Sequence, residues 1–174
     1  LSRNRVGAGG GLPDMSPMSR LTRLEIKEMG LSELPATLGL CSSLVEIHAG
    51  FNRLTAVPPS LAELRKLKVL DVRNNAIRAF PLECCSLELT LLDLSNNDLS
   101  QLPPELGLMS TLRKVALEGN PLRQLRPNVV SGPTPALLRT LADRIDDGGV
   151  AVGAEPQQVA RAGNVFGLDE RGRA

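Results

Sequence analysis

Few side chains of this 174-residue chain could carry out acid–base or nucleophilic chemistry. The single histidine, His48, could act as a general base if Asp71 oriented its ring. No nucleophile has a matching place, because Ser95 falls two repeat units after His48 in the pattern described below. One histidine with Asp71 and Asp93 on an open surface would make only a shallow metal site. We therefore predict no catalytic residue and no metal, and we interpret His48 as a surface histidine at a partner interface.

The three cysteines are Cys41, Cys84 and Cys85. An odd count that includes an adjacent pair is neither a disulfide framework nor a Cys-x-x-Cys motif. We expect small, buried thiols in a reducing compartment, which indicates a cytoplasmic protein.

A glycine cluster, GAGGG at 7–11, could in principle cradle a phosphate. However, no Lys-Ser/Thr pair follows it, and the next residues are Leu-Pro rather than the start of a helix. A flexible surface insertion is the favoured interpretation, and no cofactor is predicted.

Composition excludes two classes of partner. The formal net charge is +1 with a pI of about 7.9, so the whole chain has no field of one sign that would attract nucleic acid or an anionic membrane. With three phenylalanines and no tryptophan or tyrosine, base stacking would be hard to arrange. No stretch approaches the ~20 apolar residues of a membrane-spanning helix.

The elements that position these side chains come from a repeat. Units that begin with LxxLxL recur at intervals of 22 or 23 residues. They start at Leu21, Leu44, Leu67, Leu89 and Leu112. Alternating apolar residues predict one half-buried strand per unit, and a proline follows a second apolar set on the return path in four units. A single unit cannot bury its apolar face alone, so we expect the units to stack.

An asparagine recurs where each predicted strand turns away. These residues are Asn52, Asn75, Asn97 and Asn120. A polar amide in an apolar column must be hydrogen-bonded, so we predict a ladder in which each side chain binds the backbone of neighbouring turns. Met29 holds this position in the first full unit, and the ladder should lapse there.

The pattern LxxLxLxxNxLxxLPxxLxxL resembles the intracellular type of leucine-rich repeat. The resemblance implies an α/β fold: a leucine-rich repeat solenoid with a curved parallel sheet, one short strand per repeat and a C-terminal helical cap. Residues 119–145, GNPLRQLRPNVVSGPTPALLRTLADRI, also resemble the end of the first array in leucine-rich-repeat-containing protein 40 and its relatives. The plant Ras-group-related repeat proteins look similar. None of these families offers a catalytic motif, so the resemblance implies a binding role.

The same pattern divides the chain. The opening LSRNRV matches the second half of a repeat, so residues 1–20 are interpreted as a partial N-terminal repeat with the glycine-rich insertion, and we expect the chain to enter midway through a unit. Five repeats are expected over 21–126, a cap with a helix over 127–146, and a disordered tail over 147–174. Thr134 could N-cap the cap helix, with Pro135 at its first position.

Strand residues between the inward leucines should face the concave side of the solenoid. In the middle strands they place Val69 beside Leu91, with charged residues around this apolar pair. The predicted partner-binding residues are Glu46, His48, Phe51, Val69, Asp71, Arg73, Leu91 and Asp93. Each one taken singly could belong to a merely solvated face, but as a set they are typical of a protein-binding patch.

Two classes of function stay open. The favoured one is a non-catalytic, monomeric interaction scaffold for intracellular signalling that binds an unidentified protein partner on the concave face. The alternative is the recognition module of a larger enzyme, such as a kinase, a GTPase or a ubiquitin ligase, because the fold alone does not choose between them.

Overall fold

The computed structural model describes residues 12–15 and 17–146. The expected glycine-rich insertion at 7–11 and the expected tail at 147–174 lie outside the described residues. Within them, the chain forms five short strands and a set of short helices that alternate along the sequence. The strands are β1 (Arg23–Glu25), β2 (Glu46–His48), β3 (Val69–Asp71), β4 (Leu91–Asp93) and β5 (Lys114–Ala116).

The five strands form one parallel sheet in the order β1-β2-β3-β4-β5. Equivalent residues of successive repeats lie side by side; Leu24, Ile47, Leu70, Leu92 and Val115 form one such row. A strand of only three residues has little stability by itself. The identical register across five strands therefore depends on the inward leucines, because a one-residue slip would turn them to the solvent.

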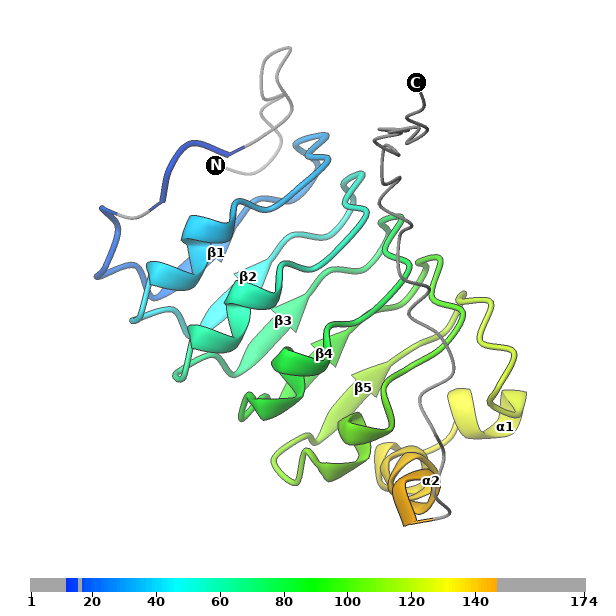
Figure 1. Ribbon diagram of the computed structural model, residues 1–174. Helices are drawn as coiled ribbons and strands as arrows, with labels where there is room; N and C mark the ends of the chain where they lie inside the picture. Colours follow the sequence, from blue (N-terminus) through cyan, green and yellow to red (C-terminus); the bar gives the residue numbers. More distant parts are fainter. Residues whose placement is uncertain (1–11, 16, 147–174) are drawn as a thin grey trace, which may run out of the picture.

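The return path of the first four repeats contains a 3₁₀ helix. These helices are η1 (Ala36–Leu40), η2 (Pro59–Glu63), η3 (Leu82–Ser86) and η4 (Pro104–Leu108). A proline in extended conformation precedes each one: Pro35, Pro58, Pro81 and Pro103. Proline suits this position because its fixed φ is compatible with the bend and its missing N–H leaves no unpaired donor. In Figure 1 the short helices form a second row in front of the strands.

The core lies between the sheet and the row of 3₁₀ helices and is almost wholly aliphatic. Leu44, Leu67 and Leu89, which open three successive repeats, are all completely buried. Close packing of so many leucines and isoleucines makes each repeat depend on its neighbours.

Two helices follow β5: α1 (Pro127–Val130) and α2 (Thr134–Asp146). Figure 1 shows them at the β5 end of the array, beyond the last strand. Leu137 and Leu141 of α2 are buried, whereas Ile145 is 38% exposed. Helix α2 packs closely on η4, where a Cβ added to Gly107 would stand only 2.6 Å from the carbonyl oxygen of Leu138.

The hydroxyl of Thr134 does not serve as the helix N-cap that local sequence suggests. Thr134 lies inside α2, and the carbonyl of Pro133 accepts hydrogen bonds from the amides of Ala136 and Leu137. The Thr134 Oγ1 instead accepts a hydrogen bond from the amide of Val115 in β5, at 3.0 Å. Thr134 therefore pairs the free amide of the last strand instead of capping its own helix.

Candidate protein-binding surface

The outward residues of the strands form the concave surface of the sheet. Strand register aligns Glu46, Val69 and Leu91 in one row. It aligns His48, Asp71 and Asp93 in the next. The structure thus brings six of the eight predicted partner-binding residues into two adjacent rows. Phe51 lies three residues after the end of β2, and Arg73 lies two residues after the end of β3.

Val69 and Leu91 are the apolar pair of this surface. They are direct partners across β3 and β4, and each is half-buried because it projects from the sheet rather than into the core. Glu46 continues the row on the β2 side and Lys114 on the β5 side. The pair is therefore a small apolar area bounded by two opposite charges.

Asp71 is more buried than expected, because Lys27, His48 and Arg73 surround its side chain. The residue is 6% exposed. Its carboxylate lies 3.6 Å from Lys27 Nζ, 3.6 Å from His48 Nδ1 and 3.7 Å from Arg73 Nε. A carboxylate buried in this way presents little surface to a partner, and its paired charges offset part of the cost of burying it. Asp71 therefore holds the surrounding cationic side chains in place.

His48 bridges two strands. Its Nε2 lies 3.2 Å from Glu46 Oε2, while its Nδ1 faces Asp71 without a hydrogen-bond partner. The Ser95 hydroxyl donates to Asp93 Oδ1 at 2.6 Å. In the described part of the chain, no hydroxyl or thiol is hydrogen-bonded to His48, so the nucleophile–base contact of covalent catalysis does not form there.

Phe51 and Arg73 form a stacked pair at the rim. The Arg73 guanidinium carbon lies 5.5 Å from the centre of the Phe51 ring, within the range of a cation–π contact. Phe51 is 47% exposed and has a φ of 58°, a left-handed conformation that costs free energy for a bulky residue. Gly50 leaves room for this pair, because a Cβ there would meet Arg73 Cγ at 3.2 Å.

Repeat position places Lys27 on the concave face, but Lys27 was not among the predicted partner-binding residues. It is half-buried and contacts Asp71 from β1's end, two strands away from the carboxylate's own strand. Its only signal in the sequence is its repeat position, which it shares with Arg73.

The four asparagines bind backbone groups, so their role is structural. Asn97 Oδ1 accepts from the amide of Ile77 at 3.0 Å, and its Nδ2 donates to the carbonyls of Val72 and Leu94 at 3.1 and 2.9 Å. Matching bonds are made by Asn52, Asn75 and Asn120. The amide of Met29 donates to Asn52 Oδ1, so the first repeat is bound to the ladder although it contributes no amide side chain of its own.

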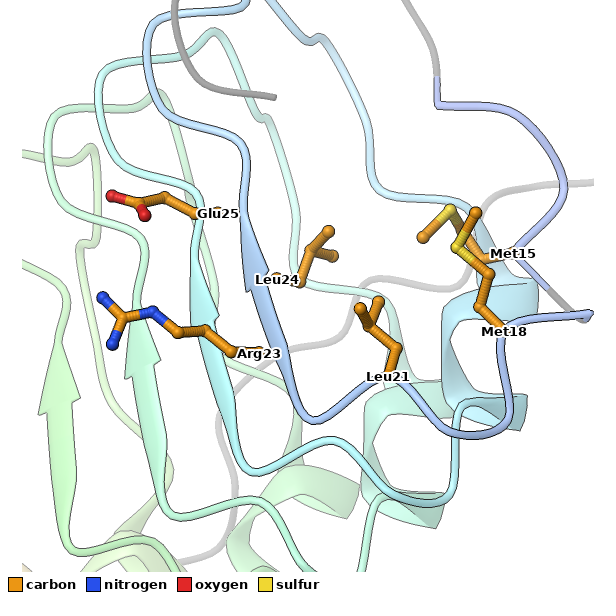
Figure 2. A pocket seen from close by; sticks show the side chains of 6 residues that line it. All are labelled: Met15, Met18, Leu21, Arg23, Leu24 and Glu25. Atoms are coloured by element: carbon orange, nitrogen blue, oxygen red, sulfur yellow. The ribbon is translucent and has the colours of Figure 1, made fainter.

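An open hollow of about 290 Å³ lies at the β1 end of the array. Its lining is Met15, Met18, Leu21, Arg23, Leu24 and Glu25 (Figure 2). The figure shows the apolar side chains on one side of β1 and Arg23 and Glu25 pointing to the other. No sequence motif predicted this hollow, because it forms where the stack of repeats ends at β1 and not within any one repeat.

The described cysteines and acidic residues were the remaining candidates for reactive chemistry or metal binding. Burial, and to a smaller extent nearby carboxylates, raise the pKa of Cys84 and of Cys85 to about 12, so both are neutral thiols near pH 7. Among residues 12–15 and 17–146, no group of three or more His, Cys, Asp or Glu side chains is arranged to hold a metal ion. In that same part of the chain, no helix has the length and apolar character needed to cross a bilayer.

Comparisons with known proteins agree with this architecture. Residues 42–99 match the family model for the leucine rich repeat. The chain is 30% identical to the protein flightless-1 homolog of Caenorhabditis elegans over 65% of its own length, and the match spans 13% of that relative.

Two solved structures share the fold. A leucine-rich repeat protein of Leptospira interrogans is similar over 75% of this chain and 37% of its own, with a TM-score of 0.57 and 24% identity. An internalin of Listeria monocytogenes is similar over 67% of this chain and 34% of its own, with a TM-score of 0.51 and 25% identity. The chain thus spans about a third of each structure. The predicted leucine-rich repeat solenoid is confirmed.

Proposed function

We propose that this leucine-rich repeat chain is a non-catalytic scaffold that binds a protein partner on the concave face of its sheet. Leucine-rich repeat folds generally serve as protein-interaction modules. The observation that carries the proposal is the Val69–Leu91 pair, which is partly exposed on a rigid sheet and cannot turn into the core. An intracellular signalling role, a cytoplasmic location and a monomeric state belong to the same proposal.

The charges around the pair support binding because they are ordered before a partner arrives. Arg23 Nη1 lies 3.0 Å from Glu46 Oε2, and Lys27, His48 and Arg73 are held around Asp71. Side chains that are already fixed lose less conformational entropy on binding. Arg73 and Phe51 add a planar cation and an exposed ring, which are frequent contributors to interface free energy.

The second candidate function is the recognition module of a larger enzyme. It is favoured by one observation: the match to the flightless-1 homolog spans only 13% of that relative, so repeats of this kind are also part of much longer proteins. If a longer parent chain exists, a catalytic motif in its flanking sequence would select this alternative.

Two finer points are also proposals. The cytoplasmic location is supported by the three free cysteines, since none pairs in a disulfide. The closer likeness to leucine-rich-repeat-containing protein 40 and its relatives rests on residues 119–145.

Leu91→Asp tests the proposed surface. The substitution would place an unpaired charge at the centre of any complex on the concave face, and it should abolish capture of the partners that the unchanged protein retains from cell lysate. Leu82→Asp is the matched control, since Leu82 is 54% exposed on η3, on the opposite side of the core. Circular dichroism checks folding in both variants. If folded Leu91→Asp retains the same proteins at the same yield, the concave face is not the binding surface.

A further inference from the structure

Basic side chains gather in the first, third and fifth repeats at the edge of the sheet where the strands begin. Backbone hydrogen bonds join the residues just before the strands into consecutive rungs: Val45 N to Thr22 O, Lys68 N to Val45 O, and Thr90 N to Lys68 O, each at 2.8 Å. Arg113 N continues the series to Thr90 O at 3.0 Å. Residues separated by a whole repeat in the sequence are therefore neighbours on this edge.

Charge is concentrated here although the whole chain is nearly neutral. The segments 19–22, 42–45, 65–68, 87–90 and 110–113 contain five basic residues and one acidic residue, Glu88. We call the five the basic edge: Arg20, Arg65, Lys66, Lys68 and Arg113.

The surfaces next to the basic edge have a different balance of basic and acidic residues. The 3₁₀ helices contain only acidic charges, at Glu63, Glu83 and Glu105. The turns at the opposite end of the strands, within 28–33, 51–56, 74–79, 96–101 and 119–124, carry equal numbers of basic and acidic residues. The formal charge of +1 for the chain therefore conceals a surplus of four positive charges on one edge.

Most of the basic edge is available to a partner. Arg65, Lys66 and Arg113 are exposed, and in the described part of the chain none of these three forms a salt bridge. Lys68 already binds a carboxylate, because its Nζ lies 2.8 Å from Glu88 Oε2. The hydrogen bond from Lys68 lowers the pKa of the Glu88 carboxyl.

The shape of the basic edge selects the kind of polyanion. Four strand spacings of about 4.8 Å give a line of roughly 19 Å, which about six extended residues would follow. The line is narrow, because Glu63 borders it on the helix side and Glu46 and Asp93 lie on the sheet face. A single extended peptide would lie between these carboxylates. A flat anionic membrane or a nucleic-acid duplex would come close to them and be repelled by their like charge.

Nucleic acid is also disfavoured by side-chain type. Of the described phenylalanines, Phe80 is buried and Phe51 follows the opposite end of its strand, so no ring stands on the basic edge to stack a base. From this segregation of charge we propose that the basic edge binds an extended acidic peptide segment of a protein partner, rich in Asp or Glu. The site is separate from the concave Val69–Leu91 pair and does not depend on it.

The test uses the full 174-residue chain and a fluorescently labelled octaglutamate peptide, with octaglutamine as the neutral probe. The peptide's Kd is measured by fluorescence anisotropy at pH 7 and low ionic strength, for the unchanged protein and for two double variants. Lys66→Glu with Arg113→Glu reverses two charges on the basic edge. Arg53→Glu with Arg78→Glu makes the same change in net charge at the opposite end of the strands, where both residues are exposed.

We expect octaglutamate to bind and octaglutamine not to bind. The basic-edge variant should raise the octaglutamate Kd by about tenfold or more, while the control should change it by less than about twofold, with both folded by circular dichroism. Equal weakening by both variants would show that net charge alone governs binding and would overturn the proposal. So would equal binding of the two peptides. An octathymidine strand, or vesicles of equal parts phosphatidylserine and phosphatidylcholine, that bound more tightly than octaglutamate and lost binding in the basic-edge variant would replace the peptide assignment.

Discussion

The Thr134 hydroxyl accepts the hydrogen bond from the Val115 amide that a sixth strand would otherwise accept. Inward residues of earlier strands and their continuations donate their amides to the next repeat, as Ala49 does to Asp71 and Leu94 does to Ala116. No further strand follows β5 in the described residues, yet the Val115 amide is paired, because Thr134 Oγ1 accepts from it at 3.0 Å. One hydroxyl on α2 thus ends the sheet without leaving this partly buried donor unpaired.

Replacing this hydroxyl should therefore destabilise the chain. Thr134→Val keeps the shape of the side chain but removes the acceptor, and we expect the free energy of unfolding to fall by about 1–3 kcal/mol, the cost of leaving a partly buried amide unpaired. The measurement is a urea melt followed by circular dichroism. Thr140→Val is the matched control, because the Thr140 hydroxyl bonds only within α2, to the exposed carbonyl of Ala136. Equal losses in the two variants would contradict a special role for Thr134.

Gly107 sets the distance between η4 and α2. In Gly107→Ala the new methyl would overlap the backbone of α2 near Leu138 and Ala142, so the helix must move away. We expect a loss of about 1–3 kcal/mol in unfolding free energy and faster hydrogen exchange in α2. Leu108→Ala is the control, since Leu108 is 64% exposed and its truncation should cost little. Unchanged exchange in α2 would show that the contact is not tight in solution.

The asparagine ladder should contribute most to the free energy of unfolding where its hydrogen bonds are buried. Asn97 is 4% exposed and binds Ile77, Val72 and Leu94. Asn97→Ala would leave these backbone groups unpaired, and we expect it to lower the unfolding free energy by about 1–3 kcal/mol in urea melts. Asp98→Ala changes the adjacent, exposed residue and should have almost no effect. If Asn97→Ala and Asp98→Ala lowered the unfolding free energy by the same amount, the ladder would be ruled out as a source of stability.

Buried thiols should make the protein less stable in alkali. The pKa of Cys84 rises from about 9 to about 12 because the thiol is buried and because Glu83 lies nearby. Between these values the unfolded chain has lost the proton and the folded chain retains it, so stability falls as the pH rises, by about 1.4 kcal/mol per pH unit for one thiol.

This prediction is checked by urea melts at pH 9 and pH 10. Cys84→Ala should lose about 1 kcal/mol less across that interval than the unchanged protein, while Ser86→Ala, at an exposed position of the same helix, should behave like the unchanged protein. Parallel behaviour of all three proteins would mean that Cys84 titrates normally in the fold.

The strands could be predicted from the sequence because two regularities coincide there. Alternation places Leu24 and Ile26 inward, and repeat spacing then fixes the register of every later strand, so the Val69–Leu91 pairing follows from counting alone. Both rules are local or periodic, and nothing in the tertiary structure opposes them.

Other features could not be predicted, because they depend on side chains that meet only after the repeats stack. The burial of Asp71 results from Lys27 and Arg73 approaching from different repeats. The role of Thr134 was misjudged because a good N-cap residue was available locally, while the unpaired Val115 amide exists only once β5 is the last strand. The left-handed φ of Phe51 has no signal in the side chain itself, since Asn74 and Asn96 adopt the same conformation at equivalent positions with less strain.

The parallel stacking of neighbouring repeats has a consequence for how the chain unfolds. Each strand pairs only with the strand one repeat away, so opening one end does not require opening the other, and the array can unzip stepwise. At the β5 end, Thr134 and the packing of α2 on η4 oppose the first step. At the β1 end, the open hollow lined by Met15, Leu21 and Leu24 leaves the array less closely packed. Unzipping should therefore start at β1, and backbone protection against exchange should rise along the array from β1 toward β4.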